Sequence, residues 1–338
     1  MNNDNRRKER IDRGIKVRSD GIYAMSSLRE MLYLSGPRII LIAGLLLLPL
    51  ALDLLPYWKR VINIMCVYAL LAISFDFLAN CLGLVCLGGA LFIGLGGYFA
   101  AIFNVYLHMP IYLSIPAAAL AGAVVSTILI LPCLSLRGVY FAIVTLMYPL
   151  LLTRLIEAFN ILGGSNGITG LASFPSQNIE NYSIIVILLA VVFALRRLLG
   201  EDIGLVMHAV KDNDQSVRAS GINVTGIKAL AVFIASFIGC LGGAYLAHLY
   251  MWAGLSLFAL DFSIIPIAAV TIGGGGSIFG AVLGCLILVP LSEFLRFFGT
   301  FRIVLYCTVL TGFIVFKSEG LMVYCTRKYQ QFERWAKE

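Results

Sequence analysis

Between positions 202 and 228 this membrane-like chain carries a compact polar stretch with residue types suited to contacts outside a bilayer. The run Asp-Asn-Asp at 212–214 supplies side-chain oxygens that cap helix N-termini, and Gly221 is suited to end the helix that they begin. A helix over roughly 213–220 would have about two turns and would be too short to be stable alone in water. We therefore predict a helix that docks on a partner; a solvated charged loop fits the same composition.

Glycine-rich segments are the second feature. Residues 83–98 contain six glycines and one alanine. Irregular backbone at membrane depth must face protein or water, so a translocation path and tight helix packing both fit this segment. The four consecutive glycines at 273–276 should break a helix. From Gly276 a glycine recurs every four residues, at Gly280 and Gly284, as on a close-packing helix face.

These segments supply the residues assigned to a path or to helix breaks. Besides Asp76, they are Gly83, Cys86, Gly88, Gly89, Gly94, Gly97, Gly273, Gly274, Gly276 and Gly280. A third, uncharged segment at 162–170 is expected to be flexible and suits a gate, or equally an ordinary connecting loop. Its assigned residues are Gly163, Gly164, Ser165, Asn166 and Gly167.

Charged residues inside the apolar runs are few. Arg154 with Glu157, and Glu293 with Arg296, have the spacing at which helical charges neutralise each other. Asp76, between two phenylalanines, is less easily explained and is the better functional candidate. One hypothesis for the chain, kept below as the alternative hypothesis, is an ion-coupled secondary transporter that uses Asp76 or Asp261.

Several chemistries are excluded by missing patterns. The chain has no Gly-x-x-x-x-Gly-Lys-Ser/Thr phosphate-binding loop, so it is not expected to bind ATP itself. It has no nucleophile–base pair typical of a hydrolase. Its eight cysteines include no Cys-x-x-Cys and lie in or beside apolar runs, which predicts buried thiols and no metal site or disulfide framework.

The elements that must position these residues are membrane helices. Hydrophobic residues make up 60% of the 338 positions and charged residues 13%, with a mean hydropathy of +0.93; soluble domains are about half apolar and about a quarter charged. We predict an all-α polytopic membrane protein with about ten spans, within a range of eight to eleven, and with broken Gly-rich helices. The predicted spans are 39–55, 61–79, 88–107, 111–133, 138–157, 182–199, 228–250, 259–272, 278–297 and 301–316.

Charge distribution predicts the orientation. Residues 1–38 carry nine Lys/Arg against five Asp/Glu and are predicted to be a basic cytoplasmic tail. The transmembrane domain then covers 39–316, with a cytoplasmic segment at 200–227, and a second cytoplasmic tail covers 317–338. The loop 158–181 falls outside. The basic tails suit an anionic membrane face rather than nucleic acid.

Five segments resemble, in order, motifs of the LivM-type permease family of branched-chain amino-acid ABC importers. Residues 83–98 are similar to Gly-Leu-x-Ser-Leu-Gly-His-x-x-Phe-x-Gly-Ile-Gly-Ala-Tyr, and 136–146 to Leu-Arg-Gly-x-Tyr-x-Ala-Ile-Val-Thr-Leu. Residues 162–168 resemble Thr-Gly-Gly-Ser-Asn-Gly-Ile, and 209–224 resemble Ala-x-Arg-Asp-Asn followed by Gly-Ile-Asn-Val. The family's Gly-Gly-x-Gly-Ser-x-x-Gly falls on 273–280.

This resemblance covers nearly all of residues 61–322. It implies a permease subunit, not an enzyme, of an importer for branched-chain or related amino acids in the bacterial cytoplasmic (inner) membrane. The implied partners are a second related permease, two cytoplasmic ATP-binding subunits that hold ATP and Mg, and a periplasmic or extracellular solute-binding protein. No cofactor is expected in this chain.

The resemblance also implies that 209–224 is the coupling helix, which seats in a groove of an ATPase subunit. The residues assigned to it are Ala209, Lys211, Asp212, Asn213, Arg218, Gly221 and Ile222. Two departures from the family pattern leave the substrate open. Cys86-Leu87-Gly88-Gly89 replaces Ser-Leu-Gly-His, and Asp76 stands where Asn is common. Related permeases handle urea, short amides and other amino acids.

Overall fold

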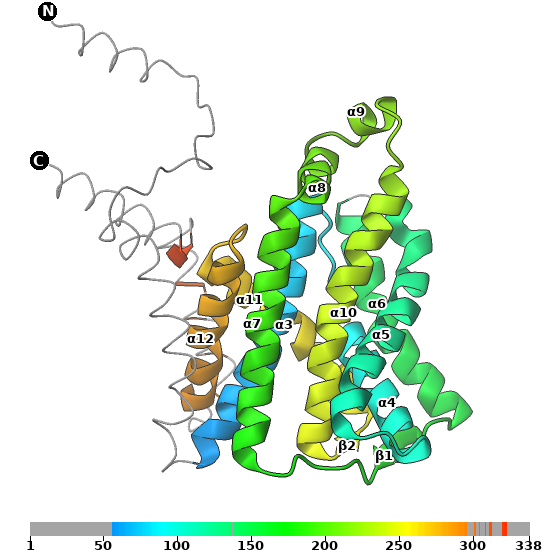
Figure 1. The fold of residues 1–338 in the computed structure, drawn as a ribbon, viewed down its shortest axis with the longest axis vertical. Coiled ribbons are helices and arrows are strands. Elements are labelled where there is room, and N and C mark those ends of the chain that lie inside the picture. The colour runs from blue at the N-terminus through cyan, green and yellow to red at the C-terminus, as the bar shows by residue number, and fades with distance from the viewer. Residues whose placement is uncertain are drawn as a thin grey trace, which may run out of the picture. The chain divides into compact units, whose positions relative to one another are not determined.

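The computed structural model describes residues 56–136 and 138–295, with single positions between 301 and 322. Within this part of the chain, eight helical segments are long and apolar enough to cross a membrane, and they run alongside one another as a bundle (Figure 1). The helices are α3 (Pro56–Leu82), α4 (Gly89–Ala101), α5 (Ile111–Ile130), α6 (Val139–Phe159), α7 (Gln177–Gly200), α10 (Val224–Tyr250), α11 (Asp261–Gly273) and α12 (Ile278–Leu295).

Three of these spans include irregular helical turns. A π-helical turn, η1 (Ile102–Tyr106), continues α4, and a 3₁₀ turn, η2 (Leu131–Ser135), continues α5. Another 3₁₀ turn, η4 (Leu255–Phe258), precedes α11. The bundle confirms the predicted all-α membrane fold and eight of its ten spans. The predicted spans 39–55 and 301–316, and most of the two predicted tails, lie outside the described residues.

Helix α10 forms the centre of the bundle and packs against α3, α4 and α5. Its close contact with α4 depends on glycine. A Cβ atom at Gly243 would lie 2.2 Å from the Ile93 carbonyl oxygen, and one at Gly96 would lie 2.3 Å from the Cys240 carbonyl oxygen. The backbones of α4 and α10 therefore meet without intervening side chains, as in close-packed membrane helices.

Helices α11 and α12 form a second close pair, joined by a turn at 274–277. The predicted break in the glycine run is confirmed, because α11 ends at Gly273. The predicted stripe is wrong in one position. Gly276 lies in the turn, outside α12, so only Gly280 and Gly284 belong to the helix face. A Cβ at Gly284 would lie 1.9 Å from the Ala269 carbonyl oxygen, which confirms tight packing there.

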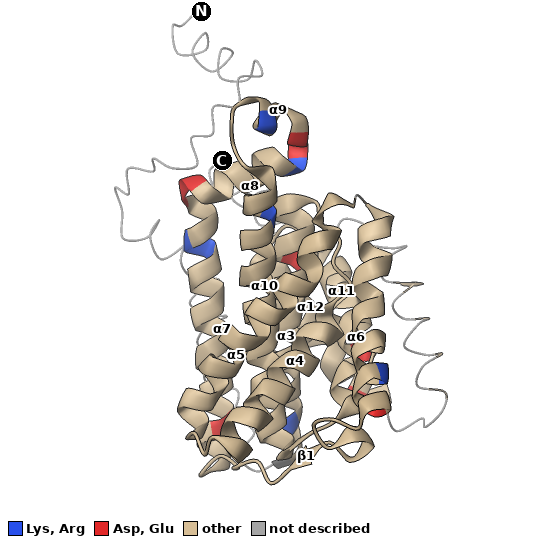
Figure 2. Ribbon diagram, turned by 90° about the vertical axis from the view of Figure 1, so that its right-hand side faces the viewer, with Lys and Arg blue, Asp and Glu red and all other residues tan. Residues whose placement is uncertain are grey.

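The two ends of the bundle differ. At one end, the strands β1 (Ile168–Thr169) and β2 (Trp252–Ala253) form an antiparallel pair. At the other end lie two short helices, α8 (Asp202–Asp212) and α9 (Asp214–Ala219) (Figure 1). Most charged residues of the described part lie near these ends, and the middle of the bundle is almost uncharged (Figure 2).

Candidate functional site

The polar stretch at 202–228 folds into two helices, where the sequence predicted one helix over roughly 213–220. Asn213 separates them because its backbone is extended, with φ −156° and ψ 100°. Its Oδ1 accepts hydrogen bonds from the backbone N–H groups of Gln215 (2.9 Å) and Ser216 (3.2 Å). The predicted N-cap is thus confirmed at Asn213, whereas Asp212 ends α8 and Asp214 begins α9.

The end of α9 is as predicted. Gly221 has φ +84°, in the left-handed region that glycine adopts most easily. Its N–H donates to the Arg218 carbonyl at 3.0 Å, and the Ile222 N–H donates to the Val217 carbonyl at 3.4 Å. These bonds turn the chain sharply from α9 toward α10.

The α8–α9 unit, residues 202–223, has a small apolar core of its own with the start of α10. Val210, Val217 and Val224 are buried together, and Val206 and Ile227 pack against them. Because these valines are buried together, the segment is a packed pair of helices and not the solvated charged loop that its composition also fits.

An ion pair at this core ties α9 to α10. Lys228 Nζ lies 2.7 Å from Asp214 Oδ2, and the two side chains are only 9% and 17% exposed. The unit is therefore fixed to the N-terminal end of α10.

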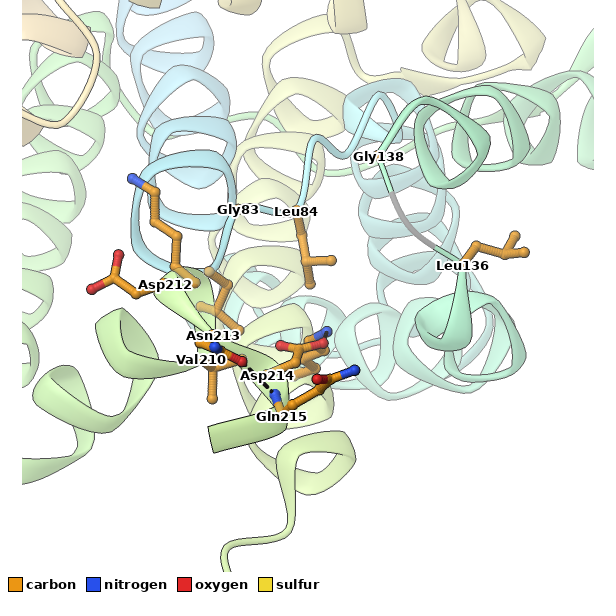
Figure 3. A pocket seen from close by; sticks show the side chains of 12 residues that line it. Gly83, Leu84, Leu136, Gly138, Val210, Asp212, Asn213, Asp214 and Gln215 are labelled. Carbon is orange, nitrogen blue, oxygen red and sulfur yellow. Dashed lines mark hydrogen bonds and ion pairs between the residues drawn. The ribbon is translucent and has the colours of Figure 1, made fainter. Parts of the chain in front are cut away.

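The residues predicted to contact an ATPase are all exposed, but Lys211, Asp212 and Asn213 lie on the side of the α8–α9 unit that faces the bundle. Ala209, Lys211, Asp212, Asn213, Arg218, Gly221 and Ile222 are each exposed. A cavity of about 450 Å³ separates the unit from the end of α3 and the turn before α6. Gly83, Leu84 and Gly138 line it on the bundle side, and Asn213 and Gln215 on the other (Figure 3).

The predicted break in 83–98 covers residues 83–88, which are not helical. Helix α4 begins at Gly89, which faces Phe262 and Ser263 near the start of α11. Ser263 lies about 15 Å along α11 from its end at Gly273, at about 1.5 Å per residue, so α4 begins inside the bundle. Residues 83–88 thus run as irregular backbone from the α8–α9 end into the bundle.

Two hydroxyl groups satisfy backbone donors of this break and of the first turn of α4. Thr145 Oγ1 accepts from the Leu87 N–H, and Ser263 Oγ accepts from the Ala90 N–H, both at 3.0 Å. Both hydroxyl-bearing residues are buried. The break therefore faces protein, as the cost of unbonded backbone in lipid requires. Sequence reasoning did not select Thr145 or Ser263; a hydroxyl within an apolar run was the available signal.

The glycines of α4 serve packing. A Cβ at Gly94 would overlap the ring of Phe258, and one at Gly97 would lie 2.4 Å from Leu257 Cδ1. Cys86 is 4% exposed, and Gly88 is the N-cap of α4. At these glycines the packing alternative is favoured, and the path-lining role of the segment stays a prediction.

Asp76 is buried near the C-terminal end of α3, and one of its oxygens accepts two hydrogen bonds. Asp76 Oδ1 accepts from the Gly276 N–H at 2.8 Å and from Asn80 Nδ2 at 2.6 Å. Lys211 Nζ in turn donates to the Asn80 carbonyl at 2.9 Å. Asp261 is exposed in the first turn of α11, at the end of that helix remote from Gly276. The two carboxylates of the alternative hypothesis therefore do not meet in one site.

The remaining sequence predictions about polar residues concern pairs of opposite charge and metal sites. Arg154 and Glu157 form the predicted pair at 2.9 Å, whereas Arg296 lies outside the described residues. No cluster of three or more His, Cys, Asp or Glu side chains suited to a metal occurs among the described residues. The cysteines of that part are buried thiols: Cys66, Cys81, Cys86, Cys133, Cys240 and Cys285.

The loop at 162–170 is held against the bundle. Gly164–Asn166 form a 3₁₀ turn, and Ile168 and Thr169 form the strand paired with β2. Trp252 Nε1 donates to the Asn166 carbonyl at 2.9 Å. The loop thus has defined contacts with the bundle, and the gate role of Gly163, Ser165 and Gly167 stays a prediction.

Comparison with known proteins gives one family. A family profile described as the permease component of the branched-chain amino acid transport system matches residues 58–316. High-affinity branched-chain amino acid transport system permease proteins LivM of Salmonella typhimurium and Escherichia coli are each 25% identical over 287 residues. These alignments cover 76% of this chain and 68% of each relative.

A third relative comes from another organism. The probable branched-chain amino acid transport permease protein LivM of Methanocaldococcus jannaschii is 28% identical over 236 residues, which are 60% of this chain and 67% of the relative. No solved structure matches the chain significantly.

Proposed function

Since the chain belongs to the branched-chain amino acid permease family, we propose that it forms half of the translocation pathway of an ATP-driven importer for branched-chain or related amino acids. In this proposal a second related permease supplies the other half. Two ATPase subunits bind ATP and Mg²⁺, and a solute-binding protein delivers the cargo from outside. The chain itself spans the membrane and is not an enzyme.

The observation that carries the proposal is the α8–α9 unit. Its seven predicted contact residues are exposed, while its valines and the Lys228–Asp214 pair fix it to α10. A short helix that is held firmly on one side and exposed on the other suits a docking element. Because the unit is ordered, a movement imposed on α9 is passed to the helices behind it instead of being absorbed in a loop.

Orientation follows from this assignment. The α8–α9 end would face the cytoplasm and the β1–β2 end the outside, which agrees with the alternation of the eight described spans. With one further span on either side, both chain termini would be cytoplasmic in the inner membrane. Lys59 and Arg60, at the outer end of α3, fit this orientation poorly on charge alone, but Lys59 Nζ donates to Asn178 Oδ1 at 3.0 Å.

The ATPase contact is tested by a charge reversal in the assembled complex. Arg218→Glu should reduce co-purification of the ATPase subunits and ATP-driven uptake by about tenfold, because a reversed charge opposes its docking site. Arg197→Glu is the matched control. Its side chain is 75% exposed and lies at the end of α7, outside α9. It should change both measurements by less than about twofold.

Equal effects of the two reversals would contradict the docking assignment.

The energy source is tested separately in proteoliposomes. Uptake should require internal ATP and ignore proton and sodium gradients, whereas uptake driven by a gradient without ATP would favour the secondary transporter.

A further inference from the structure

Asp76 lies where three separate parts of the chain meet. Its Oδ1 accepts from Gly276 in the turn between α11 and α12 and from Asn80 on its own helix. Lys211 of α8 donates to the Asn80 carbonyl at 2.9 Å. The result is a continuous set of hydrogen bonds, Lys211–Asn80–Asp76–Gly276, from the exposed α8–α9 unit to the turn at 274–277.

We propose that Asp76 is a positioning residue that makes the turn at 274–277 follow the movement of the α8–α9 unit. This inference rests on the proposed function, because it assumes that the ATPase subunits move that unit. Asp76 itself would touch neither cargo nor ATP.

The turn is built to stay in contact with this link. A Cβ at Gly275 would lie 2.9 Å from Asn80 Nδ2, so the backbone of the turn passes directly over the Asn80 side chain. Gly276 has φ +87°, a conformation that presents its N–H to the carboxylate and that other residues adopt at a cost. Gly320 packs on the same turn, since a Cβ atom added at Gly320 would lie 2.3 Å from Gly274 Cα.

Burial gives the link its strength. Asp76 is 3% exposed, so water cannot easily replace a lost bond. The Lys228–Asp214 pair fixes the α8–α9 unit to α10, and the Asp76 link connects the same unit to α3 and to the α11–α12 turn. A displacement of the unit would thus reach both halves of the described bundle.

The role of Asp76 as an acceptor can be separated from its charge. Both hydrogen bonds end on Oδ1, an atom that Asp76→Asn retains. Asp76→Leu keeps the branched shape, with a larger side chain, and has no acceptor. An ion-coupling carboxylate would fail in both variants, whereas a positioning acceptor should fail only in Asp76→Leu.

The experiment uses the complete importer, with both permeases, the ATPase subunits and the loaded binding protein, in proteoliposomes. Asp76→Leu should lower the kcat of ATP-driven uptake by about tenfold, the range expected for losing buried hydrogen bonds. The apparent KM for the loaded binding protein, the basal ATP hydrolysis and the bound ATPase subunits should stay within about twofold. Asp76→Asn should keep at least about half of the uptake.

Lys211 provides a second variant whose folding is not in question, because the residue is exposed. Lys211→Met should also lower kcat, and Lys211→Arg should restore it by supplying a donor. In the double variant Asp76→Leu/Lys211→Met the two losses should not multiply, because both break one chain of contacts.

Each contrary result overturns the inference. Full uptake by Asp76→Leu would show that the link carries no movement, and an inactive Asp76→Asn would show that the charge matters. A raised KM would place Asp76 at the binding-protein or cargo site. Failure of Asp76→Leu to assemble, or loss of ATPase subunits from Lys211→Met, would assign these residues to folding or docking alone. If the unmodified complex does not use ATP, the proposed function fails instead.

Discussion

The contact between α4 and α10 allows one substitution to be predicted in detail. Gly243→Ala places a Cβ 2.2 Å from the Ile93 carbonyl oxygen, about 1 Å closer than ordinary contact allows. The obstacle is backbone, which cannot rotate away, so the helices must separate. Overpacking of this kind costs about 1–3 kcal/mol. The better helix propensity of alanine returns up to about 1 kcal/mol, which leaves a net loss of up to about 2 kcal/mol when that gain is complete.

The neighbouring glycine supplies the control. A Cβ at Gly242 would meet Val67 Cγ1 at 3.4 Å and Ile93 Cδ1 at 3.5 Å, which is ordinary contact with flexible side chains. Gly242→Ala makes the same chemical change on the same helix without the clash. It should leave stability unchanged or raise it slightly through helix propensity.

The assay is thermal unfolding of the detergent-solubilised protein, followed by intrinsic fluorescence and by the fraction that remains monodisperse. At roughly 2–4 °C per kcal/mol, Gly243→Ala should lower Tm by up to about 8 °C. Gly242→Ala should not lower it. If both variants unfold at the same temperature, the inferred contact of the two backbones is wrong.

Two further substitutions test the break and the outer loop. Thr145→Val leaves an N–H of the break without its acceptor and should cost about 1–3 kcal/mol in thermal unfolding. Thr153→Val removes a hydroxyl that donates to the Pro149 carbonyl of its own helix and should cost less, so equal losses would refute the acceptor role. Gly167→Ala and Gly170→Ala share the strain of a positive φ, but only at Gly167 would a Cβ meet the β2 backbone, at 2.4 Å. Cleavage of the outer loop by protease should therefore increase more in Gly167→Ala, and greater cleavage in Gly170→Ala would count against the packing described.

The spans were predictable because each is a long apolar run, and a membrane requires such runs whatever their neighbours are. The local ends were partly predictable. Gly221 ends α9 as expected, but three adjacent cap-type residues at 212–214 could each begin a helix, and only the extended backbone of Asn213 shows where the two helices divide.

Contacts distant in sequence could not be predicted. Asp76 and Gly276 are 200 residues apart, and Ala90 and Ser263 are 173 apart. One sequence gives no information on which helices become neighbours, so the partners of a buried polar group remain unknown until the fold is built. The misplacement of Gly276 has a simpler cause: a four-residue spacing of glycines does not show at which of them a helix begins.

The length and fixed contacts of α10 have a mechanical consequence. Its inner end is held by Lys228, its outer end continues into β2, and its closest support is the glycine crossing with α4 at Gly243. At about 1.5 Å per residue, the inner arm from Lys228 to Gly243 is about 22 Å and the outer arm to Trp252 about 13 Å. If α10 tilts as a rigid rod about the crossing at Gly243, its end at Trp252 moves in the opposite direction to its end at Lys228. The displacement at Trp252 is then roughly 0.6 of that at Lys228. A rod of this geometry would turn a displacement of the α8–α9 unit into a smaller, opposite movement at the β1–β2 end.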